Sequence, residues 1–423
     1  MTERFVVIGG GCASLESVKA ARESGFGGEI AVMSDNNLPP YNPMLITYYA
    51  SGKIGYDALF PYVEDGMYDK YDVTCHDGSP VVRLDTEKSI VQNSKGVELE
   101  YTACVVASGA SPAIPGAFSK IKDKVYTLRS VADAVKFKEL LESDKKRAMV
   151  VGASMIGIKA VEALADAGFS VTLTDFADRI FPLASHKNCS EMIEGILREK
   201  NVNMLFGKTA EKIEEDAAGL SVFFSEEEKP TVVDHIIVCA GVRPNMSFVD
   251  PGRVKTDKGI LVNEHMETSA YGVYAAGDVC QGLDISSGDM QVLGLLSDAR
   301  LQGRTAGENI AGKRSRYSGS LPHNITHFFN NDFVAIGNVN DGDRAYEDAC
   351  EASKRFIRLA FKDNKLTGVN LLNVPEISGI LKYSLTKGIT AEYALDELRN
   401  DSIAMGKLYG KFPGIENAFT ERG

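Results

Sequence analysis

The sequence predicts an α/β protein with two Rossmann-like βαβ units, followed by a C-terminal α+β domain. A strand, a glycine-rich turn, a helix and a second strand follow one another twice, with the turns at Gly9 and Gly152 about 143 residues apart. Residues 321–423 show paired strand patterns and then helices instead. The 423 residues are 44% hydrophobic and 25% charged, which suffices for about three globular domains.

The first βαβ unit begins with the apolar strand Phe5–Ile8 and the turn Gly9–Ser14. A helix is predicted over Leu15–Ser24, and the second strand, Ile30–Met33, ends at Ser34 and Asp35. In such a unit the first glycine makes the tight turn, and the second lets the backbone approach a pyrophosphate. The phosphates then meet the positive end of the helix dipole. This unit is therefore predicted to bind a dinucleotide.

The second unit repeats this order with the strand Ala148–Val151, the turn Gly152–Gly157 and a helix predicted over Ile158–Ala167. Its second strand, Val171–Asp175, ends in an acid that can accept hydrogen bonds from a ribose. Two copies in the full strand–helix–strand context are much stronger evidence for dinucleotide binding than one glycine-rich turn.

Each copy departs from the glycine pattern at one position. Ser14 replaces the third glycine of the first turn, and Ser154 replaces the middle glycine of the second. At the end of the second strand, Asp175 would repel a 2′-phosphate, which favours NAD over NADP. Arg179 lies four residues later and is the residue that could reverse this preference.

Charge and cysteine usage exclude several classes of protein. The formal net charge of −12 disfavours general binding to nucleic acid or to an anionic membrane. No run approaches 18 apolar residues, and the N-terminus lacks a signal-peptide pattern, so neither membrane insertion nor export is expected. The seven cysteines are scattered without paired spacing, which predicts a reduced cytoplasmic protein without a bound metal.

Four further segments follow in the order of a known family: Tyr101–Pro112, Asp234–Asn245, Gly272–Val279 and Ala299–Arg304. They resemble the "ATG" strand, the "GxRPN" crossing, the glycine–aspartate flavin motif and the helix after it in the FAD-dependent pyridine nucleotide–disulfide oxidoreductase superfamily. The resemblance covers about residues 4–312. Within the superfamily, the sequence is most similar to NADH oxidases, CoA-disulfide reductases, rubredoxin and ferredoxin reductases, and the flavin part of NADH-nitrite reductase.

The resemblance implies an FAD-binding domain of residues 1–112 and 246–320, an NAD-binding domain of 113–245, and an interface or dimerisation domain of 321–423. The implied cofactor-binding residues lie in the turns and at strand ends. Those for FAD are Gly9, Gly11, Cys12, Ala13, Ser14, Ser34, Asp35, Asn42, Val81, Ala107, Ser108, Gly109, Gly277 and Asp278. Those for NAD are Gly152, Ser154, Met155, Ile156, Gly157, Asp175, Ala240 and Gly241.

The C-terminal domain has its own pattern. Phe328–Gly337 is predicted to form a hairpin, and Phe356–Phe361 with Leu366–Leu372 a second one. Helices are predicted over Ile377–Lys387 and Ala391–Asn400.

The sequence departs from the superfamily beside the expected flavin. Met44 stands where relatives carry a redox cysteine, and methionine forms no thiolate or mixed disulfide. Lys159 stands where relatives carry a glutamate, and Thr47 where its lysine partner is found, so that this pair is absent or rewired. Lys159 is either a cation near the flavin or a solvated helix residue. No catalytic residue is certain, and these three are the candidates near the flavin.

The sequence therefore predicts an FAD-dependent NAD(H) oxidoreductase that exchanges electrons with an external partner. The leading candidate for this partner is an iron–sulfur protein or an iron–sulfur subunit of a larger complex, and the resemblance also allows a homodimer. A stand-alone NADH oxidase that reduces oxygen is the alternative enzyme. A degenerate flavoprotein acting as a scaffold or redox sensor is the non-enzymatic alternative. Cys280, just after the flavin aspartate, is the cysteine whose position keeps it near the cofactor.

Overall fold

The computed structural model describes residues 3–62 and 67–388. The chain divides into two compact units, which we call unit 1 (Met1–Phe181 and Glu194–Ser320) and unit 2 (Pro182–Ile193 and Leu321–Gly423). Unit 2 thus includes a short segment that the sequence assigned to the NAD-binding domain. The division of unit 1 into separate FAD and NAD domains stays a prediction.

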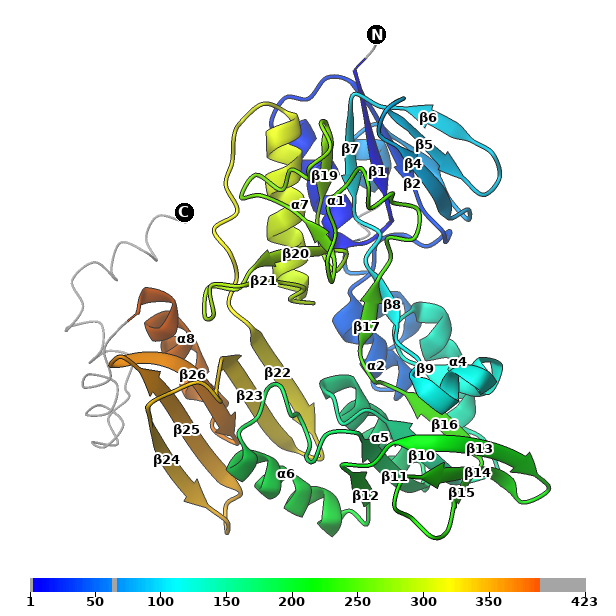
Figure 1. Cartoon of the computed structure of the whole chain (residues 1–423), viewed down its shortest axis with the longest axis vertical. Coiled ribbons are helices and arrows are strands. Elements are labelled where there is room, and N and C mark those ends of the chain that lie inside the picture. Colours follow the sequence, from blue (N-terminus) through cyan, green and yellow to red (C-terminus); the bar gives the residue numbers. More distant parts are fainter. Residues whose placement is uncertain (1–2, 63–66, 389–423) are drawn as a thin grey trace. The chain divides into compact units, whose positions relative to one another are not determined.

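Unit 1 contains two parallel five-stranded sheets (Figure 1). The first has the order β19-β7-β1-β2-β3 and is built around the buried strand β1. Its strands are β1 (Arg4–Ile8), β2 (Glu29–Met33), β3 (Val73–His76), β7 (Ala103–Val106) and β19 (Val273–Ala275). All pair in parallel, so their carboxyl ends share one edge of the sheet.

The second sheet repeats this architecture with the order β12-β11-β10-β16-β9. Its strands are β9 (Val125–Thr127), β10 (Arg147–Val151), β11 (Ser170–Asp175), β12 (Asn203–Phe206) and β16 (His235–Val238). The helices that pack on it are α4 (Val131–Leu141) and α5 (Met155–Asp166), whereas α6 (Lys187–Glu199) begins in unit 2 and ends in unit 1. The two predicted βαβ units are confirmed, because β1-α1-β2 and β10-α5-β11 each pair in parallel.

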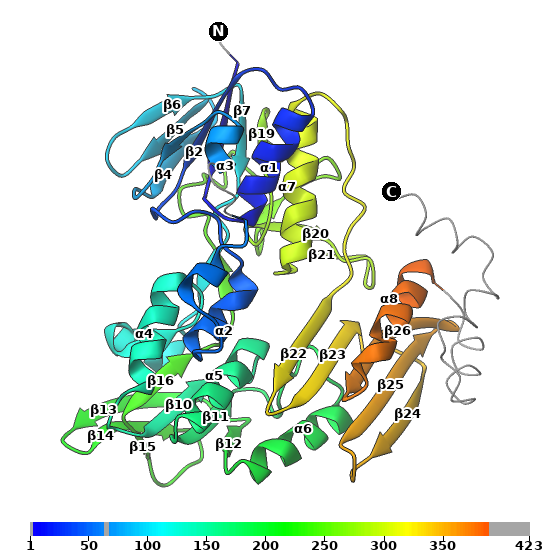
Figure 2. The same cartoon turned by 180° about the vertical axis from the view of Figure 1, so that it is seen from behind.

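The first sheet carries two helices that lie side by side, α1 (Cys12–Glu23) and α7 (Leu296–Ile310) (Figures 1 and 2). Two glycines of α7 make this close contact feasible. A Cβ at Gly303 would lie 2.3 Å from the Ala13 carbonyl oxygen, and one at Gly307 would lie 2.1 Å from that of Ser17. The middle of α7, at Gly303, thus packs against the first turn of α1, and Gly307 packs against the next turn of α1.

Smaller elements of unit 1 surround these sheets. The antiparallel sheets comprise β4 (Val81–Asp85), β5 (Ile90–Asn93) and β6 (Glu98–Glu100), then β13 (Ala210–Asp216), β14 (Gly219–Phe224) and β15 (Thr231–Val233). Short pairings join β8 (Ala110–Pro112) to β17 (Val242–Pro244), and β20 (Cys280–Leu283) to β18 (Ile260–Leu261) and β21 (Met290–Gln291). Short helical segments are η1 (Pro43–Leu45), α2 (Ile46–Ala50), η2 (Tyr56–Leu59), α3 (Met67–Lys70) and η3 (Gly116–Lys124).

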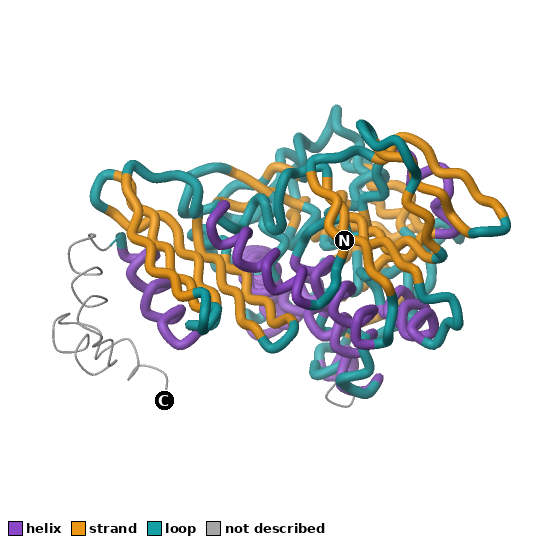
Figure 3. Tube along the Cα trace, turned by 90° about the horizontal axis from the view of Figure 1, so that it is seen from below, coloured by secondary structure: helices purple, strands orange, loops and turns teal. Residues whose placement is uncertain are grey.

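Unit 2 contains one antiparallel sheet with the order β22-β23-β26-β25-β24, visible as a continuous layer in Figure 3. Its strands are β22 (His323–Phe328), β23 (Asn331–Gly337), β24 (Arg344–Cys350), β25 (Arg355–Lys362) and β26 (Lys365–Leu372). The segment η4 (Pro375–Ile377) and the helix α8 (Ser378–Lys387) follow, and Leu381 and Leu385 of α8 join the apolar core of this unit. Both predicted hairpins and the first predicted helix are confirmed.

Three sequence predictions need comment. Helices α1 and α5 begin three residues earlier than predicted, at Cys12 and Met155, because the turn residues themselves form the first helical turn. The helix predicted over Ala391–Asn400 lies outside the described residues. In the described part of the chain, no helix combines the length and the apolar character needed to cross a membrane.

Candidate functional site

The turn between β1 and α1 has the features of an anion-binding site. Gly9 has a φ of +116°, and a Cβ there would lie 2.3 Å from the Ala107 carbonyl oxygen, so both the conformation and the contact require glycine. Gly11 begins α1 without a capping side chain, and a Cβ at Gly11 would meet no atom within 4 Å. The start of α1 thus has no side-chain cap and has open space at Gly11, where the helix dipole favours a phosphate.

The remaining residues predicted for the FAD pyrophosphate and ribityl chain converge on this turn. Cys12, Ala13 and Ser14 form the buried first turn of α1. Gly277 follows β19, and a Cβ there would lie 3.2 Å from the Ala13 Cβ and 3.6 Å from the Ala299 Cβ. The Gly277–Asp278 turn thus lies against the first turns of both α1 and α7.

The residues that follow β7 are held by hydrogen bonds to the segment after β17. The Ser108 hydroxyl donates to the Asn245 carbonyl (2.6 Å), and the Asn245 side-chain amide donates to the Ser108 carbonyl (3.0 Å). The Asn245 N–H donates to the Gly109 carbonyl. Ala107 directly precedes these residues, so the "ATG"-like strand and the "GxRPN"-like segment are joined here.

Arg129 is a site residue that sequence reasoning missed. Its guanidinium forms a 2.6 Å ion pair with Asp278 and donates to the Ala110 carbonyl at 3.0 Å. Ser130 and Asp133 directly after it form a capping box at the start of α4. This S-x-x-D pattern could have been recognised as a helix start, but nothing in it points toward Asp278.

The residues predicted for the adenosine part of FAD lie at the ends of β2 and β4. Ser34 is buried and Asp35 exposed, and the Ser79 N–H donates to the Ser34 carbonyl at 3.0 Å. Val81 begins β4 two residues later. Asn42 lies in a separate segment, where its side-chain oxygen caps η1 by accepting the Met44 N–H at 3.0 Å.

The second turn tolerates a serine for its middle glycine. Gly152 has a φ of +110°, and a Cβ there would lie 2.4 Å from the Cys239 carbonyl oxygen. The Ser154 hydroxyl donates to that carbonyl (2.9 Å) and accepts the Gly157 N–H (3.1 Å), which caps α5. The hydroxyl is thus bound within the protein, and the departure from glycine preserves the turn.

Asp175 ends β11 beside this turn. Its carboxylate accepts the Ala153 N–H at 2.7 Å and the Ala177 N–H at 2.9 Å, so it is fixed at the edge of the glycine turn. Arg179 forms an ion pair with its neighbour Asp178 at 2.8 Å. The structure brings Asp175 close to the turn, as a ribose-binding acid requires.

The other residues predicted for NAD follow parallel strands of the second sheet and lie at the same carboxyl edge as Asp175. Met155 and Ile156 form the first turn of α5, and Ile156 is exposed. Ala240 and Gly241 follow β16, and the Ala113 N–H donates to the Gly241 carbonyl at 2.9 Å.

The segment with Met44 and Thr47 carries no thiol. Met44 is 61% exposed in η1, and Thr47 is buried in α2. Lys159 is 7% exposed, so the interpretation of a solvated helix lysine is wrong. It pairs with Glu162 at 2.5 Å, and Glu162 reaches Lys53 at 3.2 Å.

Lys159 also connects α5 to α2, because its ammonium lies 5.2 Å from the centre of the Tyr48 ring. The expected glutamate–lysine pair is thus rewired. Two lysines share a glutamate one helical turn further along α5, and the cation at position 159 is desolvated.

The cysteines around the first turn are protonated thiols. Burial raises the pKa of Cys12 to about 11 and raises the pKa of Cys280 well above its ordinary value. The Cys280 thiol donates to the Gln302 side-chain oxygen at 3.3 Å. A nucleophilic thiolate is disfavoured at both positions. Among the described residues, no group of three or more His, Cys, Asp or Glu side chains could hold a metal ion.

The donor groups of both turns fit dinucleotides. The first offers uncapped helix N–H groups with an open approach and an aspartate on the facing strand end. The second offers a glycine turn with a fixed carboxylate at the end of the next strand. A protein with two such units in parallel sheets belongs to the class of two-dinucleotide oxidoreductases.

Comparison with known proteins agrees with this class. Residues 3–303 match the family model described as pyridine nucleotide-disulphide oxidoreductase, and the chain belongs to this family. It is an oxidoreductase whose cofactors are FAD and NAD(H).

Two relatives and one solved structure illustrate the similarity. The NADH-dependent phenylglyoxylate dehydrogenase subunit epsilon of Aromatoleum evansii is 28% identical over 371 residues, which are 86% of this chain and 87% of that protein. The NADH-rubredoxin oxidoreductase of Clostridium acetobutylicum is 24% identical over 409 residues, 94% of this chain and 99% of that one. The covalent putidaredoxin reductase–putidaredoxin complex matches in fold with a TM-score of 0.85 and 22% identity, covering 95% of this chain and 99% of that chain.

Proposed function

We propose that this chain moves electrons between NAD(H) and an external iron–sulfur partner through FAD, without a protein thiol in the path. The observation that carries the proposal is the chemistry around the first turn. Position 44 is a methionine, and the neighbouring thiols Cys12 and Cys280 are buried with raised pKa values. A bound reduced flavin has no disulfide there to which it could pass electrons, because all seven cysteines are free thiols.

An external partner follows from electron counting. NADH delivers two electrons as a hydride, whereas an iron–sulfur cluster takes one electron at a time, and a flavin can perform both kinds of transfer. The described residues hold no metal cluster site of their own. The similarity to a dehydrogenase subunit and to a rubredoxin oxidoreductase supports an iron–sulfur protein or subunit as this partner.

The proposal assigns the residues as follows. The first turn, with the ends of β2, β7 and β19, would hold FAD, and Asp278 with Arg129 would bind its polar chain. The second turn would hold NAD(H), with Asp175 on the adenosine ribose. The protein residues then position the two cofactors, and FAD supplies the hydride and single-electron chemistry.

Compartment and assembly are further proposals. All seven cysteines are free, which supports a reducing compartment such as the cytoplasm. A homodimer formed through residues 321–423 is proposed from the family resemblance, and light scattering of the purified protein tests it.

The experiment compares acceptors under identical conditions. The FAD-loaded protein is mixed with NADH and either air-saturated buffer or an anaerobic rubredoxin- or ferredoxin-type protein, and both rates are followed optically. We expect reduction of the iron–sulfur protein to be much faster than oxygen consumption. If oxygen consumption accounts for NADH oxidation and the iron–sulfur protein is not reduced, the chain is an NADH oxidase. If NADH does not reduce the flavin at all, the chain is a scaffold.

A further inference from the structure

Asp298 is a buried carboxylate that the proposed electron path does not use. It lies in the first turn of α7 and is 3% exposed. One of its oxygens accepts the Tyr317 hydroxyl at 2.5 Å, and the other accepts the Gln302 amide at 2.9 Å. Within residues 3–62 and 67–388 no lysine, arginine or histidine pairs with it. The negative charge is therefore held by neutral donors alone.

Gln302 connects this carboxylate to the predicted flavin turn. Its side-chain oxygen accepts the Gly277 N–H at 2.7 Å and the Cys280 thiol at 3.3 Å. Since Gly277 also packs against Ala299 of α7, a cofactor held by Gly277 and Asp278 lies beside the helical turn that contains Asp298.

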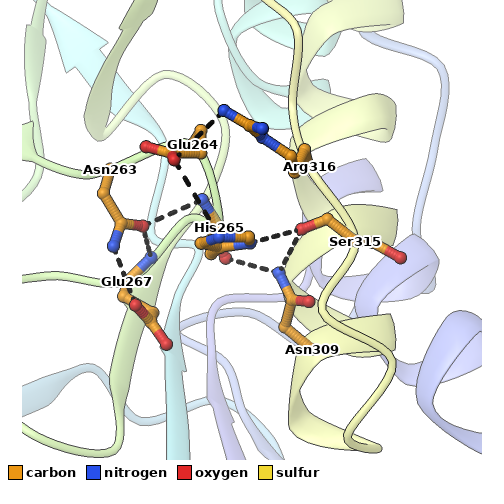
Figure 4. A network of polar contacts seen from close by, with 7 residues as sticks. All are labelled: Asn263, Glu264, His265, Glu267, Asn309, Ser315 and Arg316. Atoms are coloured by element: carbon orange, nitrogen blue, oxygen red, sulfur yellow. Dashed lines mark hydrogen bonds and ion pairs between the residues drawn. The ribbon is translucent and has the colours of Figure 1, made fainter.

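A separate polar network holds the chain just before Tyr317, at Ser315 and Arg316 (Figure 4). The Asn309 amide donates to the carbonyls of His265 (2.8 Å) and Ser315 (2.9 Å), and the His265 Nδ1 lies 2.7 Å from the same Ser315 carbonyl. The Tyr317 N–H donates to the Glu264 carbonyl at 2.6 Å. These bonds fix the backbone after α7 at the residue whose hydroxyl donates to Asp298.

The balance of these contacts places the titration of Asp298 close to neutral pH. Burial, and to a smaller extent the like charge of Asp278, raise the pKa of Asp298, whereas hydrogen bonds from Tyr317 and Ser320 lower it, and the resulting pKa is about 6. The nearby Cys280 is a neutral thiol because burial raises its pKa. A carboxylate in this balance responds to any added negative charge in its surroundings.

We propose that Asp298 gains a proton when the FAD of this enzyme is reduced and releases it when the flavin is reoxidised. This inference rests on the proposed function. Hydride transfer from NADH brings two electrons and one proton to the flavin and leaves one additional negative charge at the site. The Asp298 carboxylate takes one proton from water and becomes a neutral acid. When two electrons leave for the external iron–sulfur acceptor, the flavin proton and the Asp298 proton both return to water.

The test is the flavin midpoint potential as a function of pH in the wild type and in Asp298→Asn. Asparagine is similar in shape to the protonated acid, so the two proteins should share one potential below about pH 5. Above about pH 6, the wild-type potential should fall below that of the variant by a further ~30 mV per pH unit, the value of one proton for a two-electron couple. The gap should become constant once Asp298 is ionised in both redox states.

Asp234→Asn is the matched control, because it removes one negative charge from an ion pair with Arg147 in the second sheet. It should keep the wild-type pH profile. Tyr317→Phe removes a donor that stabilises the carboxylate and should move the onset of the gap to higher pH. The proposal is overturned if the potentials of the wild type and Asp298→Asn do not differ, or differ equally at every pH. It is also overturned if Asp234→Asn shows the same pH-dependent difference from the wild type.

Thermal unfolding of the FAD-free proteins separates this inference from the proposed function. Because the folded pKa lies above the ordinary value, the wild type should lose stability relative to Asp298→Asn as pH rises from about 4 to 6, and the difference should then stay constant. A difference independent of pH contradicts the inference even if FAD binds. A wild-type protein that binds no FAD contradicts the proposed function, while the unfolding profile still reports the titration of Asp298.

Discussion

Substitution of Gly11 by valine should separate cofactor binding from folding. Gly11 has φ −88° and ψ −171°, which any residue adopts, and a Cβ there meets no protein atom within 4 Å. The free energy of unfolding of the FAD-free protein should therefore fall by only about 0.5–1 kcal/mol, the cost of a poor N-terminal capping residue. The side chain would instead fill the space in front of α1. Loss of two charge-assisted hydrogen bonds to a pyrophosphate costs about 3–6 kcal/mol, so FAD should bind at least about 100-fold more weakly.

The assay measures FAD content from absorbance after purification, FAD affinity by fluorescence titration of the FAD-free protein, and thermal unfolding. Gly27→Val is the matched control, because Gly27 also has open space at its Cβ position and lies in an exposed turn before β2. We expect a colourless, folded Gly11→Val protein and a yellow Gly27→Val protein. A fully yellow Gly11→Val protein with native affinity would refute the assignment of the pyrophosphate to this turn.

Three other changes should have distinct effects. Asp175→Ala should slow flavin reduction by NADH about 10-fold or more, because ribose hydrogen bonds are lost, and should slow reduction by NADPH less. Equal slowing with both donors in stopped-flow measurements would argue against a ribose contact. Arg129→Met leaves the Asp278 carboxylate without its cation and should weaken FAD binding by about 1–2 kcal/mol, because the pair is partly exposed. An unchanged FAD affinity in the fluorescence titration would show that this ion pair is dispensable. Burial and Lys382 lower the pKa of His323 to about 4, so unit 2 should lose about 1–2 kcal/mol of stability as pH falls from 6.5 to 4. His323→Gln should remove this loss in acid unfolding curves. A variant with the same pH dependence of unfolding as the wild type would contradict the prediction.

The sequence predicted the parallel βαβ units well, because local patterns determine them. Apolar runs such as Phe5–Ile8, each followed by a glycine turn, specify a buried strand and the start of a helix within about 15 residues. The helix starts were predicted three residues late at Cys12 and Met155, since the turn residues were counted as loop. The periodicity of the sequence does not distinguish the first helical turn from the turn before it.

Contacts between distant segments could not be predicted in this way. The Arg129–Asp278 pair joins residues 149 positions apart, and no local pattern at either residue specifies the other. The same holds for the burial of Lys159, which depends on Glu162 one turn away and on Tyr48 and Lys53 from a separate segment. Asp298 could be recognised only as an acid in a helical stretch, because its burial depends on how α7 packs.

The central claim is that electrons leave the flavin without passing through a protein thiol, and an anaerobic titration with NADH tests it most directly. If the claim holds, the flavin absorbance bleaches fully at about one NADH per FAD, without a long-wavelength thiolate-to-flavin band. A redox-active disulfide would instead take up a second pair of electrons and require a second NADH. Cys280→Ser should then keep FAD and retain turnover with ferricyanide. Consumption of two equivalents of NADH, or loss of turnover in Cys280→Ser with FAD still bound, would contradict the account and identify Cys280 as a redox centre.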